Sequence, residues 1–205
     1  ARCLILNEAM TDLVLASKSP RRAELLRQLG LTFSTVKPEV EEVLLPGESP
    51  EEIVLRLARD KSNAVRQKLI GPKIVIAADT VVVIDNRIIG KPKSREDGIE
   101  TLERLSGREH KVYTGVVIST DSHQFPIVSE TKVHFRTLSK EEAEKYWLTG
   151  EPVDKAGAYG IQGIGALFVS GIEGSYSNVV GLPLMETSHV LNQLGIDCLA
   201  LNEGA

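Results

Sequence analysis

Residues 74–84 read IVIAADTVVVI, and this stretch decides the fold class. Five apolar or small residues, 74–78, come before Asp79 and Thr80, and the apolar pattern then continues over residues 81–84. A short, continuous apolar run rich in β-branched residues is typical of a strand that is buried in a sheet covered by helices. We therefore expect a buried strand that ends at Asp79.

Strand-like and helix-like segments alternate upstream of this stretch. Ser19 and Ser49 each precede a proline, as N-cap residues often do, and Glu52 completes a capping box with Ser49. Gly30 is a helix stop signal. The upstream patterns predict a strand over residues 13–16, a helix over 20–29, a strand over 33–37 and a helix from 50 to about 68.

The alternation continues downstream. Ser94 and Ser139 each begin a predicted helix, the second over residues 139–148. A long antiparallel pair is predicted over residues 112–120 and 127–135, a helix over 183–194 and a last strand over 198–201. Helices that alternate with hairpin strands predict an α/β fold in which a mixed central sheet has flanking helices.

Composition excludes several classes of function. The 24 Lys and Arg residues against 28 Asp and Glu residues give a net charge of −4, so the positive field of a duplex-binding protein is lacking. No apolar run approaches the roughly 18 residues that span a bilayer. Aromatic residues make up only 4%, too few for a platform that stacks single-stranded nucleic acid. We expect a cytoplasmic protein with no membrane or nucleic-acid duplex partner.

Histidine and glycine motifs exclude further classes. The four histidines form no HxxxH or HExxH pattern, so a histidine metal site is unsupported. We place His110, His123 and His189 in surface contexts and His134 in a strand. The chain also lacks the Walker, GxGxxG and GxSxG motifs of P-loop, dinucleotide-binding and α/β-hydrolase proteins.

The first candidate site is the sequence SKSPRR at residues 17–22, where a strand leads into a helix. Unpaired N–H groups and the helix dipole favour an anion at a helix N-terminus. Ser17 and Ser19 supply hydroxyls there, while Arg21 and Arg22 supply positive charges that oppose the dipole unless an anion is bound. The alternative is that both arginines are solvated beside an ordinary N-cap.

Asp79 is the second candidate, because a carboxylate after a buried strand lies where open α/β sheets place their ligands. It could bind a divalent cation or activate water as a general base. The alternative is a turn aspartate that accepts a hydrogen bond from its own backbone.

Two lysines occupy unusual positions. Lys61 falls within the apolar stripe of its predicted helix, beside Leu57 and Ala58, so that it either extends out to solvent or reaches a buried anion. Lys91 stands between Gly90 and Pro92, where the backbone is fixed and the amine projects from a strand end. A plain turn lysine is the alternative for Lys91.

The remaining candidates are a carboxylate and an amide. Glu42, next to Glu41 in an acidic loop, is suited to Mg²⁺, which prefers one or two carboxylates together with phosphate oxygens. An ordinary acidic surface loop is the alternative. Gln162 lies in a segment where seven of the 17 glycines fall within residues 157–181, and its amide can both donate to and accept from a base edge. A buried amide that pairs with backbone is equally common.

Taken in order along the chain, these segments resemble the Maf family of nucleoside triphosphate pyrophosphatases, from residue 13 to residue 194. The motifs that carry the resemblance are Ser17-x-Ser19-Pro20-Arg21-Arg22, Glu41-Glu42, Leu57-Ala58-x-x-Lys61, Ala78-Asp79-Thr80-Val81-Val82, Gly90-Lys91-Pro92, residues 154–163 and Ser177-Asn178-Val179-Val180-Gly181-Leu182-Pro183. The resemblance implies one catalytic domain over residues 11–201, with two lobes around a cleft, similar to inosine triphosphate pyrophosphatases.

The resemblance also implies an activity: metal-dependent cleavage between the α- and β-phosphates, with Mg²⁺ or Mn²⁺. It makes Asp79 the proton acceptor, and it places Arg21, Thr80 and Gln162 at the specificity positions of the dTTP/UTP branch. The cleft positions that it also matches are Ser17, Glu42, Lys61 and Lys91. Arg22 adds charge for the phosphates, and Glu42 with Asp79 would hold the metal. A nucleotide-binding regulator of cell division without turnover is the alternative function, and a homodimer is plausible.

Overall fold

The computed structural model describes residues 13–199 of the 205-residue chain. The strands are β1 (Leu13–Ala16), β2 (Ser34–Thr35), β3 (Ile74–Ile84), β4 (Arg87–Ile89), β5 (Glu109–Ser119), β6 (Gln124–Phe135) and β7 (Val169–Glu173). The helices are α1 (Pro20–Gln28), α2 (Pro50–Arg66), α3 (Arg95–Leu105), α4 (Lys140–Trp147), α5 (Tyr176–Val180) and α6 (Leu184–Gln193). Three short 3₁₀ turns are η1 (Glu151–Asp154), η2 (Ala156–Ala158) and η3 (Ile164–Phe168).

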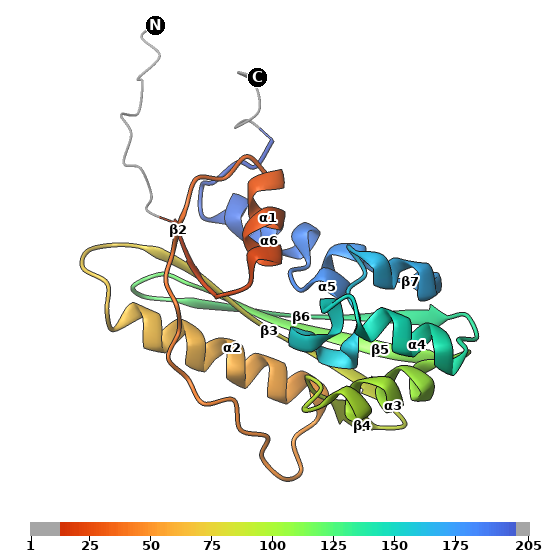
Figure 1. Ribbon diagram of the computed structural model, residues 1–205. Helices are drawn as coiled ribbons and strands as arrows, with labels where there is room; N and C mark the ends of the chain where they lie inside the picture. Colours follow the sequence, from red (N-terminus) through yellow and green to blue (C-terminus); the bar gives the residue numbers. More distant parts are fainter. Residues whose placement is uncertain (1–12, 200–205) are drawn as a thin grey trace, which may run out of the picture.

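The strands form one mixed sheet in the order β2-β1-β3-β5-β6-β7, with β4 also paired to β3. β1 is parallel to β2 and β3, whereas the pairs formed by β3, β4, β5, β6 and β7 with one another are antiparallel. The predicted mixed α/β sheet with flanking helices is therefore confirmed. The long strands β3, β5 and β6 cross the whole molecule (Figure 1).

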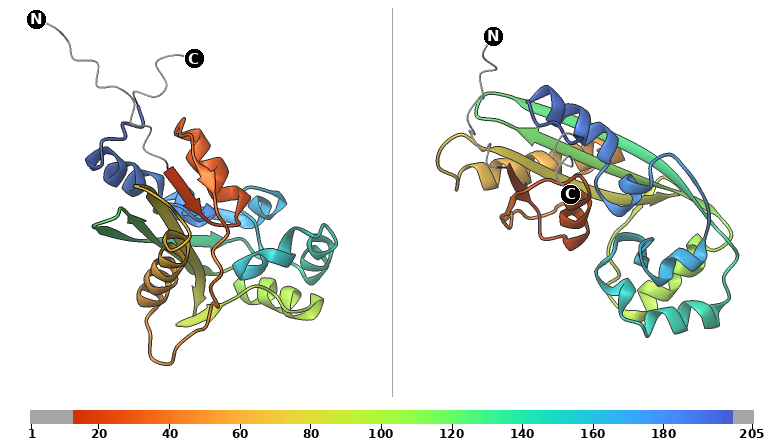
Figure 2. Two further views of the ribbon diagram at one scale, coloured as in Figure 1. Left: turned by 90° about the vertical axis from the view of Figure 1, so that its left-hand side faces the viewer. Right: turned by 90° about the horizontal axis from the view of Figure 1, so that it is seen from above.

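Helices cover the two faces of this sheet. Along β3 successive side chains point to opposite faces, so Val81 and Val83 pack with α2 residues such as Leu57, while Ile76 and Val82 join the larger core on the other face. Figure 1 shows α2 beneath the sheet and α1, α5 and α6 above it. Seen from above, α1 lies apart from the group formed by α3 and α4 (Figure 2).

β3 differs from the prediction, because it runs through Asp79 instead of ending there. The whole strand pairs with β5, and Asp79 lies opposite Gly115. On its other edge, pairing with β1 stops at Ala77 and pairing with β4 begins only at Val82. Asp79 and Thr80 therefore sit in a gap between two neighbouring strands, which leaves them open to a ligand although they lie in mid-strand.

All five predicted helices are confirmed, the predicted capping box at Ser49 is formed, and the structure shows a second one at Ser139. The Ser19 hydroxyl does not cap α1. The strand expected over residues 33–37 shrinks to β2, which is two residues long. The last predicted strand is wrong at Cys198 and Leu199, which lie in a turn, and its residues 200–201 fall outside the described part.

Within residues 13–199, no helix is long and apolar enough to cross a membrane. The limits of the single catalytic domain, residues 11–201, stay a prediction.

Candidate active site

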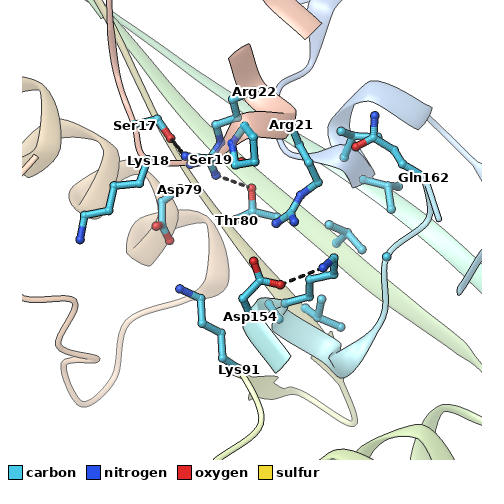
Figure 3. A pocket seen from close by; sticks show the side chains of 18 of the residues that line it. Ser17, Lys18, Ser19, Arg21, Arg22, Asp79, Thr80, Lys91, Asp154 and Gln162 are labelled. Atoms are coloured by element: carbon cyan, nitrogen blue, oxygen red, sulfur yellow. Dashed lines mark hydrogen bonds and ion pairs between the residues drawn. The ribbon is translucent and has the colours of Figure 1, made fainter. Parts of the chain in front are cut away.

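A cavity of about 520 Å³ opens at the gap in the sheet beside Asp79. The loop between β1 and α1, the helix α2, the strand β3 and the segment around residues 154–162 all contribute to its walls (Figure 3). All nine site residues predicted from the sequence line this one cavity: Ser17, Arg21, Arg22, Glu42, Lys61, Asp79, Thr80, Lys91 and Gln162. Their placement together is a finding, while the role of each stays a prediction.

The Lys61 ammonium contacts two carboxylates at the α2 side of the cavity. Asp79 points to the α2 face of β3, where the Lys61 Nζ donates a hydrogen bond to its Oδ1. The same Nζ lies 2.6 Å from the Oε1 of Glu42. The side chains of Lys61 and Asp79 are only 8% and 10% exposed, so Lys61 reaches a buried anion instead of extending to solvent.

Burial and charge act in opposite directions on these carboxyls. Burial raises the pKa of Asp79 above its ordinary value, and the charge and hydrogen bond of Lys61 only partly counteract this. For the more exposed Glu42, burial alone would raise the pKa, but the hydrogen bond and charge of Lys61 outweigh it, so the pKa is lowered. Asp79 is therefore the better base of the two.

The donor set at this end fits a divalent cation. Glu42 and Asp79 already converge on one positive charge, that of Lys61. The Asp79 Oδ2 makes no hydrogen bond with any residue in the described part of the chain. Two carboxylates beside a phosphate site are the ligands that Mg²⁺ prefers.

A second group with ligand-like spacing lies outside the cavity. Glu109, His134 and Glu173 offer atoms within 4.8 Å of one another on β5, β6 and β7. The Lys132 Nζ lies 3.6 Å from Glu109 and 3.9 Å from Glu173. None of the three residues lines the cavity, so this group is separate from the metal site expected at Asp79.

Thr80 points to the opposite face of β3 and holds Arg22. The Arg22 Nη2 donates to the Thr80 Oγ1 at 3.0 Å, and its Nε donates to the Gly181 carbonyl at 2.7 Å. The Thr114 hydroxyl donates to the Asn178 carbonyl at 3.0 Å, so the Thr80 hydroxyl must donate to Thr114, 2.9 Å away. The Thr80 proton is thus directed away from the cavity.

Three other groups in the cavity are left to meet a ligand. Arg21, Lys91 and Gln162 make no side-chain hydrogen bond or ion pair with residues 13–199. Figure 3 shows Arg21 reaching from α1 toward Asp154, and Gln162 far from Asp79 across the cavity. Unpaired positive charges beside a buried carboxylate indicate a ligand that is anionic and long enough to span the cavity.

His110 was not predicted to lie near the site, and its expected surface position is wrong. It is 1% exposed, and its Nε2 lies 2.8 Å from the hydroxyl of Tyr159, a residue that lines the cavity. Burial lowers the pKa of His110 to about 4, so the ring is neutral at pH 7. His110 lies on the same face of β5 as Val112 and Val116, because side chains alternate along a strand. This two-residue spacing is the sequence signal that could have predicted its burial.

A mixed α/β sheet with a carboxylate at an internal gap, beside a buried lysine and unpaired cations, is typical of a protein that binds phosphorylated ligands. The sequence profile of Maf-like proteins matches residues 12–194, and the chain belongs to the Maf family.

Curated relatives agree with this family. The dTTP/UTP pyrophosphatase of Pseudoalteromonas atlantica is 48% identical over 187 residues, which cover 90% of this chain and 97% of that protein. The dTTP/UTP pyrophosphatase of Acinetobacter baylyi is 49% identical over 180 residues, which cover 88% and 98%. Among solved structures, a HAM1 protein from Coxiella burnetii has a TM-score of 0.48 at 16% identity and covers 90% of this chain and 100% of that one.

Proposed function

We propose that this protein hydrolyses dTTP and UTP to the nucleoside monophosphate and pyrophosphate. The observation that carries the proposal is the single cavity in which Asp79, Lys61 and Lys91 lie at one end and Gln162 at the other, with Arg21 and Arg22 between them. The names of the relatives at 48% and 49% identity supply the substrate class.

The proposed reaction is a displacement at the α-phosphorus. A water oxygen forms the new bond to phosphorus, the bond to the α–β bridging oxygen breaks, and pyrophosphate leaves with that oxygen. The water proton passes to Asp79, whose Oδ1 is held by Lys61 while its Oδ2 makes no hydrogen bond in the described part of the chain. Because burial raises the pKa of Asp79, this carboxylate is a stronger base than one on the surface.

The cations of the cavity suit the charge of a triphosphate. Arg22 is fixed by Ser17, Thr80 and Gly181, whereas Arg21 and Lys91 have no partner within residues 13–199 and can turn toward phosphate oxygens. Such charge stabilises a transition state in which negative charge is spread over phosphoryl oxygens. Mg²⁺ or Mn²⁺ held by Glu42 would neutralise further phosphate charge, and Asp79 would join Glu42 as a ligand only in the alternative in which it is not the base.

The Gln162 end would select the base. An amide that has no hydrogen-bond partner in the described part of the chain can donate to one edge atom of a pyrimidine and accept from another. Thr80 would contribute to specificity through Arg22, because its hydroxyl accepts from Arg22 and donates to Thr114.

The test is pyrophosphate release from a panel of nucleoside triphosphates, each with Mg²⁺, with Mn²⁺ or without metal. Release that needs metal and is fastest with dTTP or UTP is expected. Release that is fastest with a purine nucleotide would keep the chemistry and overturn the base preference. Binding of nucleotides without any release would favour the alternative, a non-catalytic regulator of cell division.

A cytoplasmic location and a homodimer stay predictions from the sequence. Size-exclusion chromatography with light scattering, with and without dTTP, distinguishes one copy from two.

A further inference from the structure

The loop that carries Gln162 has little regular structure of its own. Between η2 and η3 the chain passes through Tyr159–Gly163 with only a turn and a bend, and the one backbone hydrogen bond within that stretch runs from the Gly163 N–H to the Gly160 carbonyl, 3.2 Å. A segment this poor in internal contacts needs an external partner to keep one conformation.

That partner is the carboxylate of Glu151, the first residue of η1. Its Oε2 accepts from the Ile164 N–H at 2.9 Å, and its Oε1 accepts from the Gly165 N–H at 3.0 Å. The Oε1 also accepts from the Tyr146 hydroxyl at 2.7 Å, and this hydroxyl accepts from the Gly160 N–H at 3.0 Å. Three backbone N–H groups on both sides of Gln162 thus converge on one Glu–Tyr pair.

The glycines of the loop fit closely around this pair. A Cβ at Gly160 would lie 2.9 Å from the Glu151 Oε1, and a Cβ at Gly163 would overlap the Glu151 carboxylate. A Cβ at Gly165 would lie 2.7 Å from the Tyr146 hydroxyl. The carboxylate therefore fills the inner side of the loop, and the backbone is wrapped around it.

Glu151 is itself held in place from outside the loop. Its backbone N–H donates to the Thr149 Oγ1 at 3.2 Å, and its carbonyl accepts from the Lys155 Nζ at 2.6 Å. Burial alone would raise the pKa of Glu151, but the hydrogen bonds from Tyr146, Gly165 and Ile164 outweigh it and lower the pKa. The side chain is therefore an ionised acceptor at neutral pH, and it does not line the cavity.

We propose that Glu151, together with Tyr146, is the positioning residue that holds Gln162 at the far end of the cavity and so sets the choice of nucleobase. The inference rests on the proposed function, because it explains how the base-reading amide of that function keeps its place. Glu151 touches neither the cavity nor the reacting end, so its effect acts through the loop.

The test is a double-mutant cycle on substrate selection. Glu151→Gln replaces one of the two acceptor oxygens by an NH₂ group that faces a backbone N–H, while the size of the side chain is kept. Values of kcat and KM are measured for dTTP, UTP, dATP and dGTP in the wild type, Glu151→Gln, Gln162→Ala and the double variant. Glu144→Gln is the matched control and is expected to leave the ratio unchanged, because Glu144 is a half-buried carboxylate on α4 that pairs with Arg95 at 3.7 Å and does not line the cavity.

The expected result is a pyrimidine-to-purine ratio of kcat/KM that is at least about fivefold lower in Glu151→Gln, chiefly through KM for dTTP, with kcat within about threefold. In the double variant, Glu151→Gln is expected to change the ratio of Gln162→Ala by less than about twofold, since both act through one group. A ratio that is unchanged, or effects that multiply, would overturn the proposal.

Tyr146→Phe provides a second variant, which keeps the carboxylate and removes the hydroxyl that donates to Glu151 and accepts from the Gly160 N–H. We expect a smaller loss of selectivity in the same direction, and an unaltered pyrimidine-to-purine ratio would also count against the proposal. Wild-type protein that releases no pyrophosphate from any nucleotide would overturn the proposed function and this inference together. If the wild-type protein prefers pyrimidines, and Glu151→Gln and Tyr146→Phe keep the same preference, this inference alone is overturned.

Discussion

At one end of the cavity, Asp79 and Lys61 come from β3 and α2, two long and regular elements, whereas at the other end Gln162 comes from a glycine-rich loop. The first two side chains are nearly buried and paired with each other. The Gln162 side chain is exposed and has no hydrogen-bond partner within residues 13–199. At the charged end two side chains on regular elements thus hold each other, while the amide end is held only through its backbone.

The difference follows from what each end is proposed to do. A base that must accept a proton from a positioned water needs a fixed place and a raised pKa, and both come from burial between a sheet and a helix. A group that reads a base needs hydrogen-bonding atoms that are free until the ligand arrives. Changes at the Asp79 end should therefore affect turnover, and changes at the Gln162 end should affect selection.

The largest effect is expected from Asp79→Asn, which keeps the shape and removes the base. The value of kcat with dTTP should fall by at least about 100-fold, within the range for loss of a general base. The control is Asp60→Asn, because Asp60 is another carboxylate near Lys61 in the sequence, on α2, where it pairs with Arg56 at 3.6 Å. Turnover close to wild type in Asp79→Asn would remove Asp79 from the mechanism.

Lys61→Met tests the pairing at the same end. Loss of a hydrogen bond between charged groups, about 1.5–3 kcal/mol, should lower kcat by about 10- to 100-fold at pH 7. Because Lys61 counteracts the rise in the pKa of Asp79, its removal should raise that pKa further and move the acid limb of the kcat profile to higher pH. Lys68→Met is the control, because Lys68 forms an exposed ion pair with Glu39.

Stability should respond to pH in the same Lys61→Met variant. The folded-state pKa of Asp79 lies above the unfolded one, so the folded protein binds the proton more tightly, and the free energy of unfolding rises as the pH falls through the folded pKa. Urea unfolding at a series of pH values should therefore show the variant approaching the wild type at low pH. A gap between them that stays constant with pH would contradict this assignment.

Gly115→Ala tests why α2 lies close enough for Lys61 to reach Asp79. Gly115 is the cross-strand partner of Asp79, and a Cβ there would lie 2.5 Å from the carbonyl carbon of Val54 in α2. Displacing the helix should cost about 1–3 kcal/mol of unfolding free energy and lower kcat about tenfold or less. Gly171→Ala is the control, because its nearest atom, on His134, would be 3.7 Å away. Wild-type stability and kcat in Gly115→Ala would show that this close approach is not required.

The sequence predicted the regular elements because their signals are local. The capping box at Ser49 and the apolar run that became β3 need only neighbouring residues to be read. The gap at Asp79 needs the register of β3 with both β1 and β4, and no local pattern contains that information. For the same reason, the sequence left open whether Lys61 reaches an anion, since its partner lies 18 residues away on another element.

The candidate site shows the same difference between what local sequence patterns predict and what only the fold reveals. Its residues were grouped by family resemblance and individual side-chain chemistry, and the structure brings them to one cavity. Glu151 was not a candidate, because two of the three groups that donate to its carboxylate are backbone N–H groups, which a sequence pattern does not reveal. The spacing of Gly160, Gly163 and Gly165 was the available sign that something lies against that backbone.

The smallest loss of total activity is expected from Gln162→Ala, which tests the other end of the cavity. Removing the amide deletes hydrogen bonds that only the matching base can make, each about 0.5–1.5 kcal/mol, so the ratio of kcat/KM for dTTP over dGTP should fall about tenfold. The kcat with dTTP should change by less than about threefold, because Asp79 and Lys61 are untouched. Gln67→Ala, an exposed glutamine at the end of α2, is the control. If the ratio stays the same while kcat falls, Gln162 serves turnover instead of selection, and the division between the two ends of the cavity is wrong.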